Sequence, residues 1–177
     1  GHTMRGYRKR PGTQGFSVPL VGASLFFIIS LFLFASYKNS AYQQAKKEIY
    51  SLYTANRAFD LDEVYQDGLT AIYAKEYGKT ATEAGCEALE QTGLPYVLLL
   101  SQFSAPVERV YVTNCQLSET GREKKARTYD YTVSVRFCLE KGDEVLAPEK
   151  TMDFHGTVVM KKKGWFRWLL DGVTLGE

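Results

Sequence analysis

The hydrophobic pattern of the chain divides into three successive parts. Residues 16–35 read FSVPLVGASLFFIISLFLFA, and no charged residue lies between Arg10 and Lys38. Residues 38–100 then place apolar side chains at three- and four-residue spacing, which is typical of amphipathic helices. After Pro106 the spacing changes to two, which is typical of strands with one buried face. The order is therefore a long apolar segment, then helices, then strands.

The apolar segment predicts one transmembrane helix over residues 16–37. About twenty apolar residues at a rise of 1.5 Å each cover roughly the 30 Å hydrocarbon core of a bilayer. A cleaved signal peptide is the alternative, but its apolar region is shorter, and Phe34-Ala35-Ser36 is a poor cleavage site. We expect an uncleaved anchor, whose main apolar side chains are Phe16, Leu25, Phe26, Phe27, Ile28, Ile29, Leu31, Phe32, Leu33 and Phe34.

A short basic tail precedes this segment and predicts the orientation of the chain. Residues 1–3 look like a tag remnant before Met4, and residues 1–15 hold four of the 22 Lys and Arg but no acid. The positive-inside rule then places the N-terminus in the cytoplasm and the C-terminal domain outside it. The rest of the chain carries a slight excess of acid, so we expect no direct binding of nucleic acid by its main body.

Three helices are predicted between the anchor and the strands. The first, residues 38–59, continues outward as a stalk. The second begins at Asp60, which suits an N-cap, and ends near Gly78. The third begins at Thr80 and ends at Gly93. A short apolar piece after it fits either a helix or a strand.

Alternation of apolar and polar residues predicts four strands, over residues 107–117, 128–139, 151–161 and 165–173. In the second strand Tyr129, Tyr131, Val133, Val135, Phe137 and Leu139 share one face. The polar stretch 121–126 is predicted as a loop and 141–144 as a turn. Helices that precede such strands indicate an α+β domain, residues 60–177, with helices packed on an antiparallel sheet of about four strands.

Candidate catalytic chemistry is sparse. The chain has no Gly-rich phosphate loop, nucleophile elbow or metal-ligand spacing. His155 and Asp153 share one face of a predicted strand and form the one acid–base pair worth testing. A histidine in a strand is more often structural, so we expect no enzyme, no cofactor and no metal.

Three cysteines lie outside the cytoplasm in this topology, where disulfides persist. Cys115 and Cys138 belong to the first two predicted strands and are candidates for a disulfide if the register allows. A bond from Cys86 to the sheet and three buried thiols are the open alternatives. Because the number is odd, at least one thiol stays free or pairs between chains.

The stretch KKKGWFRWLL, residues 161–170, predicts a turn followed by the last strand. Gly164 suits the turn, where exposed lysines are expected. The strand behind the turn is apolar on both faces, which is more than a water-facing strand needs. We therefore predict a protein interface at Trp165, Phe166, Arg167 and Trp168.

The closing pattern FHGTVVMKKKGWFRWLLDGVTL, two long strands with Trp165 just after a tight turn, resembles the end of nuclear transport factor 2-like domains. That resemblance implies a strongly curved sheet that forms a cone. The basic tail, single anchor and long outer helix look like the inner-membrane assembly-factor subunit of type IV secretion and conjugation systems, Gram-positive type.

The resemblance implies a function as well as a fold. It implies a non-enzymatic scaffold in a bacterial cell membrane that forms homo-oligomers and contacts other channel subunits. An extracytoplasmic sensor or ligand-binding module is the alternative, with a small molecule in an apolar pocket of the cone. A filled cone favours the scaffold, and an open apolar pocket favours the binding module.

Overall fold

A computed structural model of the chain describes residues 21–33, 40–56 and 66–176. The chain divides into two compact units, Gly1–Lys38 and Asn39–Glu177, which are described separately below.

In the first unit, residues 21–33 are helical. Their apolar side chains are exposed, at 74% for Phe26 and at more than half for most of the others. Among the described residues, no helix is both long enough and apolar enough to cross a bilayer. The predicted span of residues 16–37 extends beyond this helix at both ends, and Phe16 and Phe34 lie outside the described residues.

The second unit contains the helices α2 (Ala41–Leu52), α4 (Leu69–Tyr77), α5 (Glu83–Thr92) and α6 (Tyr96–Leu99). Two N-caps follow the usual side-chain rule, because the hydroxyls of Ser40 and Thr82 accept backbone N–H groups of the first turn. The piece that the sequence left open, α6, is helical.

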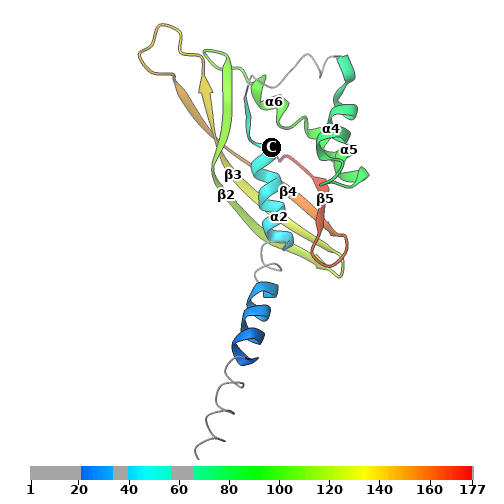
Figure 1. Ribbon diagram of the computed structural model, residues 1–177. Coiled ribbons are helices and arrows are strands. Elements are labelled where there is room, and N and C mark those ends of the chain that lie inside the picture. The colour runs from blue at the N-terminus through cyan, green and yellow to red at the C-terminus, as the bar shows by residue number, and fades with distance from the viewer. Residues whose placement is uncertain (1–20, 34–39, 57–65, 177) are drawn as a thin grey trace, which may run out of the picture. The chain divides into compact units, whose positions relative to one another are not determined.

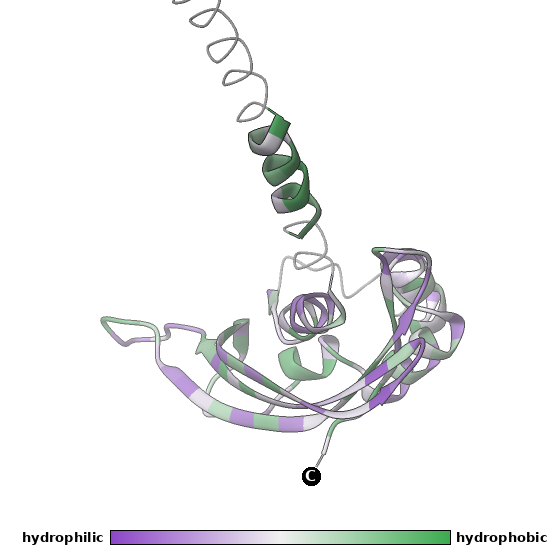
Figure 2. Cartoon of the chain, turned by 90° about the horizontal axis from the view of Figure 1, so that it is seen from below, coloured by the Kyte–Doolittle hydropathy of each residue, from purple (hydrophilic) through white to green (hydrophobic). Residues whose placement is uncertain are grey.

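Five strands form one antiparallel sheet in sequence order: β1 (Ala55–Asn56), β2 (Val107–Glu123), β3 (Ala126–Leu139), β4 (Glu149–Lys162) and β5 (Trp168–Val173). The sheet curls into a half-barrel, with α2 lying in its hollow (Figures 1 and 2). The predicted α+β class is therefore confirmed, with one strand more than expected. The extra strand, β1, is two residues long and directly follows α2.

The core lies between α2 and the concave face of the sheet. Ile49, Leu52 and Tyr53 on α2 are fully buried, as are the inward residues of β3 from Tyr131 to Leu139. The Tyr53 hydroxyl donates to the Tyr131 hydroxyl at 2.8 Å. Residues 38–59 were predicted as a separate stalk. That boundary does not hold for α2, which is a core element of the unit Asn39–Glu177.

The predicted helix boundaries are correct at Gly78 and Gly93, which directly follow α4 and α5. The N-cap predicted at Asp60 lies outside the described residues. The start predicted at Thr80 is two residues early, because backbone groups of Thr80 and Thr82 pair with Leu170 of β5.

Two of the predicted strand ends are also wrong. Residues 121–123 extend β2 rather than forming a loop, and Gly121 pairs with Thr128 across the ladder. The last strand begins at Trp168 rather than Trp165. Residues 163–167 form a turn instead, closed by a hydrogen bond from Lys163 N–H to Arg167 O, with Gly164 at a φ of 73°.

Candidate functional site

The turns of two hairpins lie side by side at one end of the sheet. The β2–β3 turn contains Lys124 and Lys125, and the β4–β5 turn follows Lys162. The backbone N–H of Lys162 donates to the carbonyl of Lys125 at 2.8 Å, which holds the two turns together. In Figure 1 both turns lie at the end where α2 begins. Contact between Tyr42 in the first turn of α2 and Tyr129 near the start of β3, with ring centroids 6.0 Å apart, agrees with this placement.

This end of the domain carries a concentration of positive charge. We call it the basic end and define it by the exposed lysines Lys124, Lys125, Lys161, Lys162 and Lys163, together with Arg167. Among the residues that the structure describes, none of these five lysines takes part in an ion pair. Their charges therefore face solvent without local compensation.

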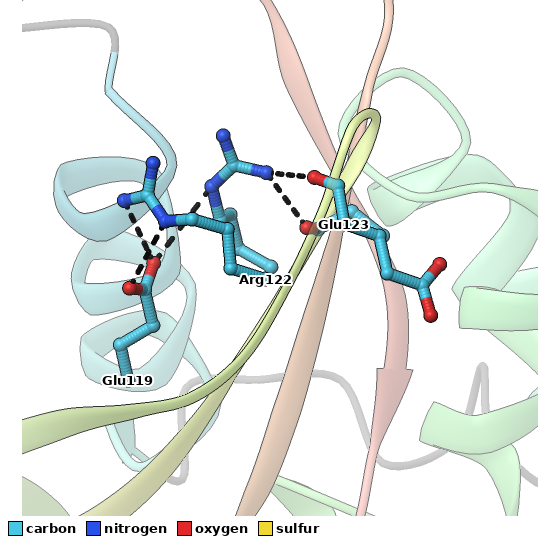
Figure 3. A network of polar contacts seen from close by, with 5 residues as sticks. Glu119, Arg122 and Glu123 are labelled. Carbon is cyan, nitrogen blue, oxygen red and sulfur yellow. Dashed lines mark hydrogen bonds and ion pairs between the residues drawn. The ribbon is translucent and has the colours of Figure 1, made fainter.

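Beside them, a polar network offsets two arginines. The carboxylate of Glu119 accepts hydrogen bonds from the Arg122 guanidinium at 3.1 and 3.2 Å (Figure 3). Arg127 lies 3.7 Å from the same carboxylate and also donates to the carbonyls of Glu123 and Ala126. This network fixes the end of the β2–β3 hairpin and leaves the lysines as the uncompensated charge.

The four residues predicted as one interface have different surroundings. Trp165 is 82% exposed, and Phe166 is 39% exposed, with ring centroids 6.5 Å apart. Trp168 is half-buried instead, with Arg127 and Lys162 within 5.1 and 6.0 Å of its ring. The structure therefore does not bring the four together as one strand face. The exposed aromatic surface is the turn alone.

Arg167 bridges the hairpin to the helical layer. Its guanidinium donates to the backbone carbonyl of Lys79 in the α4–α5 connection. A pocket of about 410 Å³ lies at this junction, lined by Lys79, residues 161–163, Arg167 and the start of α5. Glu83 is the acid in its lining, so the pocket is predominantly basic.

The opposite end of the sheet differs in composition. The β3–β4 loop exposes Val145 and Leu146 almost fully, at 87% and 79%. Glu140, Asp143 and Glu144 precede this apolar pair. The two ends therefore present opposite charge, one basic and aromatic and the other acidic and aliphatic.

A larger pocket, about 560 Å³, lies where the end of α2 meets β1 and β2. Its lining mixes polar and charged side chains such as Asn56, Glu76 and Arg109 with Pro95 and Tyr111. The residues that fill the concave face, such as Leu52 and Phe137, are not among those that line it. An apolar pocket inside the cone, which the binding-module alternative predicts, is thus not found among the described residues.

Glu48 is a buried carboxyl group in the middle of α2. Its side chain is 7% exposed, and burial raises its pKa to about 7, against a smaller opposing effect of the Thr80 hydroxyl. The sequence gave no sign of this, because Glu48 follows two lysines and resembles a solvated position. It lies on the same face as Ala41, Ala45 and Leu52, and that spacing was the available signal.

The proposed disulfide between Cys115 and Cys138 is not formed. All three cysteines are free thiols. Cys115 pairs with Val133 and Cys138 with Arg109, so five residues separate the two thiols along β3. At about 3.3 Å per residue this is roughly 17 Å, far beyond disulfide reach. Burial raises the pKa of the Cys86 and Cys115 thiols, which keeps both protonated and unreactive.

The candidate acid–base pair is exposed on the outer side of β4. His155 and Asp153 are both exposed, and Asp153 accepts a hydrogen bond from Ser134 at 2.7 Å. Neither residue lines any of the pockets described above, so the hypothesis of a catalytic pair within the cone is wrong. Among the described residues, no group of three His, Cys, Asp or Glu is placed to hold a metal ion.

Comparison with known proteins adds no functional assignment. The chain matches no protein-family model, and no curated protein matches it. Proposals about its function therefore depend on the sequence pattern and on the geometry above.

Sequence reasoning missed the pairing of the two lysine-rich turns. It treated Lys124 and Lys125 as an ordinary loop and residues 161–163 as a separate turn. The signal was present, because alternate turns of an antiparallel meander lie at the same end of the sheet. Two lysine-rich turns that are separated by two strands therefore meet.

Proposed function

We propose that the protein is a membrane-anchored, non-enzymatic scaffold of a bacterial type IV secretion or conjugative DNA transfer channel. Residues 16–37 serve as its anchor, with the N-terminus in the cytoplasm. The domain from Asn39 onward acts outside the cytoplasm by contacting copies of itself and other channel subunits. The proposal includes a nuclear transport factor 2-like cone as its fold.

The filled concave face is the observation that supports this proposal most. Tyr53 of α2 occupies the hollow of the sheet and lies 5.4 Å, between ring centroids, from Phe154. Ile49 and Leu52 are buried beside it. A domain that uses its hollow for its own core is suited to present outer surfaces to partners. This favours a scaffold over a binding module with a ligand in the cone.

The β3–β4 loop is our choice for the contact with channel subunits. Val145 and Leu146 form an exposed aliphatic pair on a loop, where few internal contacts constrain the sequence. Exposed aliphatic side chains beside acids suit the rim and centre of a modest protein interface.

Deletion of the gene from its mobile element tests the scaffold function. We expect conjugative transfer to be lost and to return when the full chain is supplied in trans. Transfer that continues unchanged after deletion contradicts the proposal.

A double variant, Val145→Ser with Leu146→Ser, tests the contact surface in the same assay. It should be produced and retained in membranes like the native chain but should restore transfer poorly. The matched control is Val97→Ser with Leu100→Ser, which removes a second exposed aliphatic pair elsewhere on the domain. Equal effects of the two double variants would exclude a specific role for the loop.

A further inference from the structure

We propose that the basic end is a docking surface for an anionic phospholipid bilayer. In this proposal the lysines of the two turns face lipid phosphates, and Trp165 and Phe166 enter the interfacial layer of the membrane. The proposal rests on the anchor in the proposed function, because the anchor supplies the adjacent bilayer.

The charge of the surface is the first argument. Five lysines lie on two turns that a backbone hydrogen bond holds together, and none is in an ion pair among the described residues. A cluster of basic side chains attracts an anionic membrane surface, and each Lys within a Debye length adds to that attraction. The structure shows this cluster as one surface, although the sequence places its lysines in two separate runs.

The aromatic side chains are the second argument. Trp165 and Phe166 lie at the tip of the β4–β5 turn, directly after the three lysines of that hairpin. Tryptophan favours the membrane interface because its ring is apolar and its indole N–H is polar. A Trp that is 82% exposed at a turn is otherwise an unexplained apolar surface in water.

The position of the surface on the domain is the third argument. Both turns lie at the end where α2 begins. Three residues separate the predicted span, which ends at residue 37, from the N-cap Ser40. Three residues reach at most roughly 11 Å, so the anchor would tether this end of the domain, rather than the acidic loop, beside the membrane.

The basic pocket completes the surface. Its volume of about 410 Å³ is open to side chains of Lys79, Lys161 and Arg167, and the start of α5 lies in its wall. Backbone N–H groups and lysines are the usual ligands of phosphate. We assign this pocket to a lipid headgroup whose acyl chains remain in the bilayer beside Trp165.

Tryptophan quenching in proteoliposomes tests the proposal with the full chain. The chain is reconstituted in vesicles with brominated acyl chains, made of phosphatidylcholine either alone or with phosphatidylglycerol. The chain has two tryptophans, so the signal of Trp165 is the difference between the native chain and Trp165→Phe. We expect the Trp165 emission to be blue-shifted and quenched when phosphatidylglycerol is present, and to recover in high salt.

Charge variants define the surface that is responsible. The double variant Lys161→Gln with Lys163→Gln should lower the ratio of docked to undocked protein by about fivefold per lysine. The matched control, Lys141→Gln with Lys150→Gln, removes the same charge at the opposite end of the sheet and should change nothing. Equal effects of the two variants overturn the proposal, because the attraction would then follow net charge alone.

The remaining outcomes separate this proposal from the proposed function. Retention of the chain in carbonate-washed vesicles without quenching of Trp165 overturns the docking and leaves the anchor in place. Release by carbonate overturns the anchor and the docking together. If Trp165 responds to an oligonucleotide or to self-association, and not to the lipid, the surface binds nucleic acid or protein and the docking proposal is wrong.

Discussion

The interior under the curved sheet and the basic end of the same sheet follow different rules. In the interior, side chains such as Tyr53, Tyr131 and Phe137 each contact several others and leave no exposed surface. At the basic end, five lysines and Trp165 face solvent with few partners. Folding free energy is therefore concentrated in the interior, and the basic end is free to serve binding. Substitutions in the two regions should separate stability from function.

The largest effect is expected for Phe137→Ala. Phe137 is fully buried, and its ring lies 5.1 Å from Phe103 and 6.3 Å from Phe154. Loss of the ring leaves a cavity, so the free energy of unfolding should fall by about 3–5 kcal/mol. Urea unfolding of the full chain in detergent measures it. Phe166→Ala, which removes the same side chain at the basic end, is the control and should change it by less than about 0.5 kcal/mol.

The next effect depends on pH and comes from Glu48. Its pKa is raised from 4.5 to about 7, so the folded state binds a proton more tightly than the unfolded state does. Stability is thus greatest below the unfolded value and falls as the pH rises from there through the folded value. Glu48→Gln cannot ionise and should gain up to about 3 kcal/mol above neutral pH.

Unfolding curves across the acid-to-neutral range check this prediction. The native chain should lose stability as the pH rises, and Glu48→Gln should give a flatter profile. Glu87→Gln, at an exposed position of α5, should keep the native slope. A slope that is unchanged in Glu48→Gln would mean that Glu48 is solvated in solution.

A smaller loss is expected for Tyr131→Phe. The Tyr131 hydroxyl accepts from Tyr53 and donates to the carbonyl of Thr174, each at 2.8 Å. Its removal leaves the buried Tyr53 hydroxyl without this acceptor and should cost about 1–3 kcal/mol. Tyr53→Phe removes a donor and leaves the bond to Thr174 intact, so its cost in the same unfolding assay should be smaller. The reverse order would show that the hydroxyl pair is not coupled as described.

The interior was largely predictable from the sequence. The alternation from Tyr129 to Leu139 has period two, and all six inward residues of that strand are buried. The glycines that end α4 and α5 were equally readable, because a helix needs a permissive residue at that place. These predictions succeed because a buried face imposes one periodic requirement on many residues at once.

The basic end was less predictable, because local backbone geometry outweighs the hydrophobic pattern there. The sequence from Trp165 to Val173 alternates like a strand, but the turn takes up residues 163–167 first. Likewise, the polar residues 121–123 extend β2 because pairing with β3 continues, and polar side chains suffice where both faces meet water. The register that separates Cys115 from Cys138 also depends on pairing between strands, which single-strand patterns do not specify.

The smallest change in stability, and the sharpest separation of the two regions, is expected for Trp165→Ala. Its 82% exposed side chain has few contacts to lose, so the free energy of unfolding should stay within about 0.5 kcal/mol of the native value. Trp168→Ala is the control three residues away, where the ring is half-buried, packs against the core and lies near Arg127. Unfolding of both variants, measured beside binding to phosphatidylglycerol vesicles and self-association, should give opposite results. Trp165→Ala should lose an interaction at full stability, and Trp168→Ala should lose stability first. If both variants unfold alike, the hairpin turn belongs to the folding core, and the distinction between interior and basic end does not extend to the tip of the sheet.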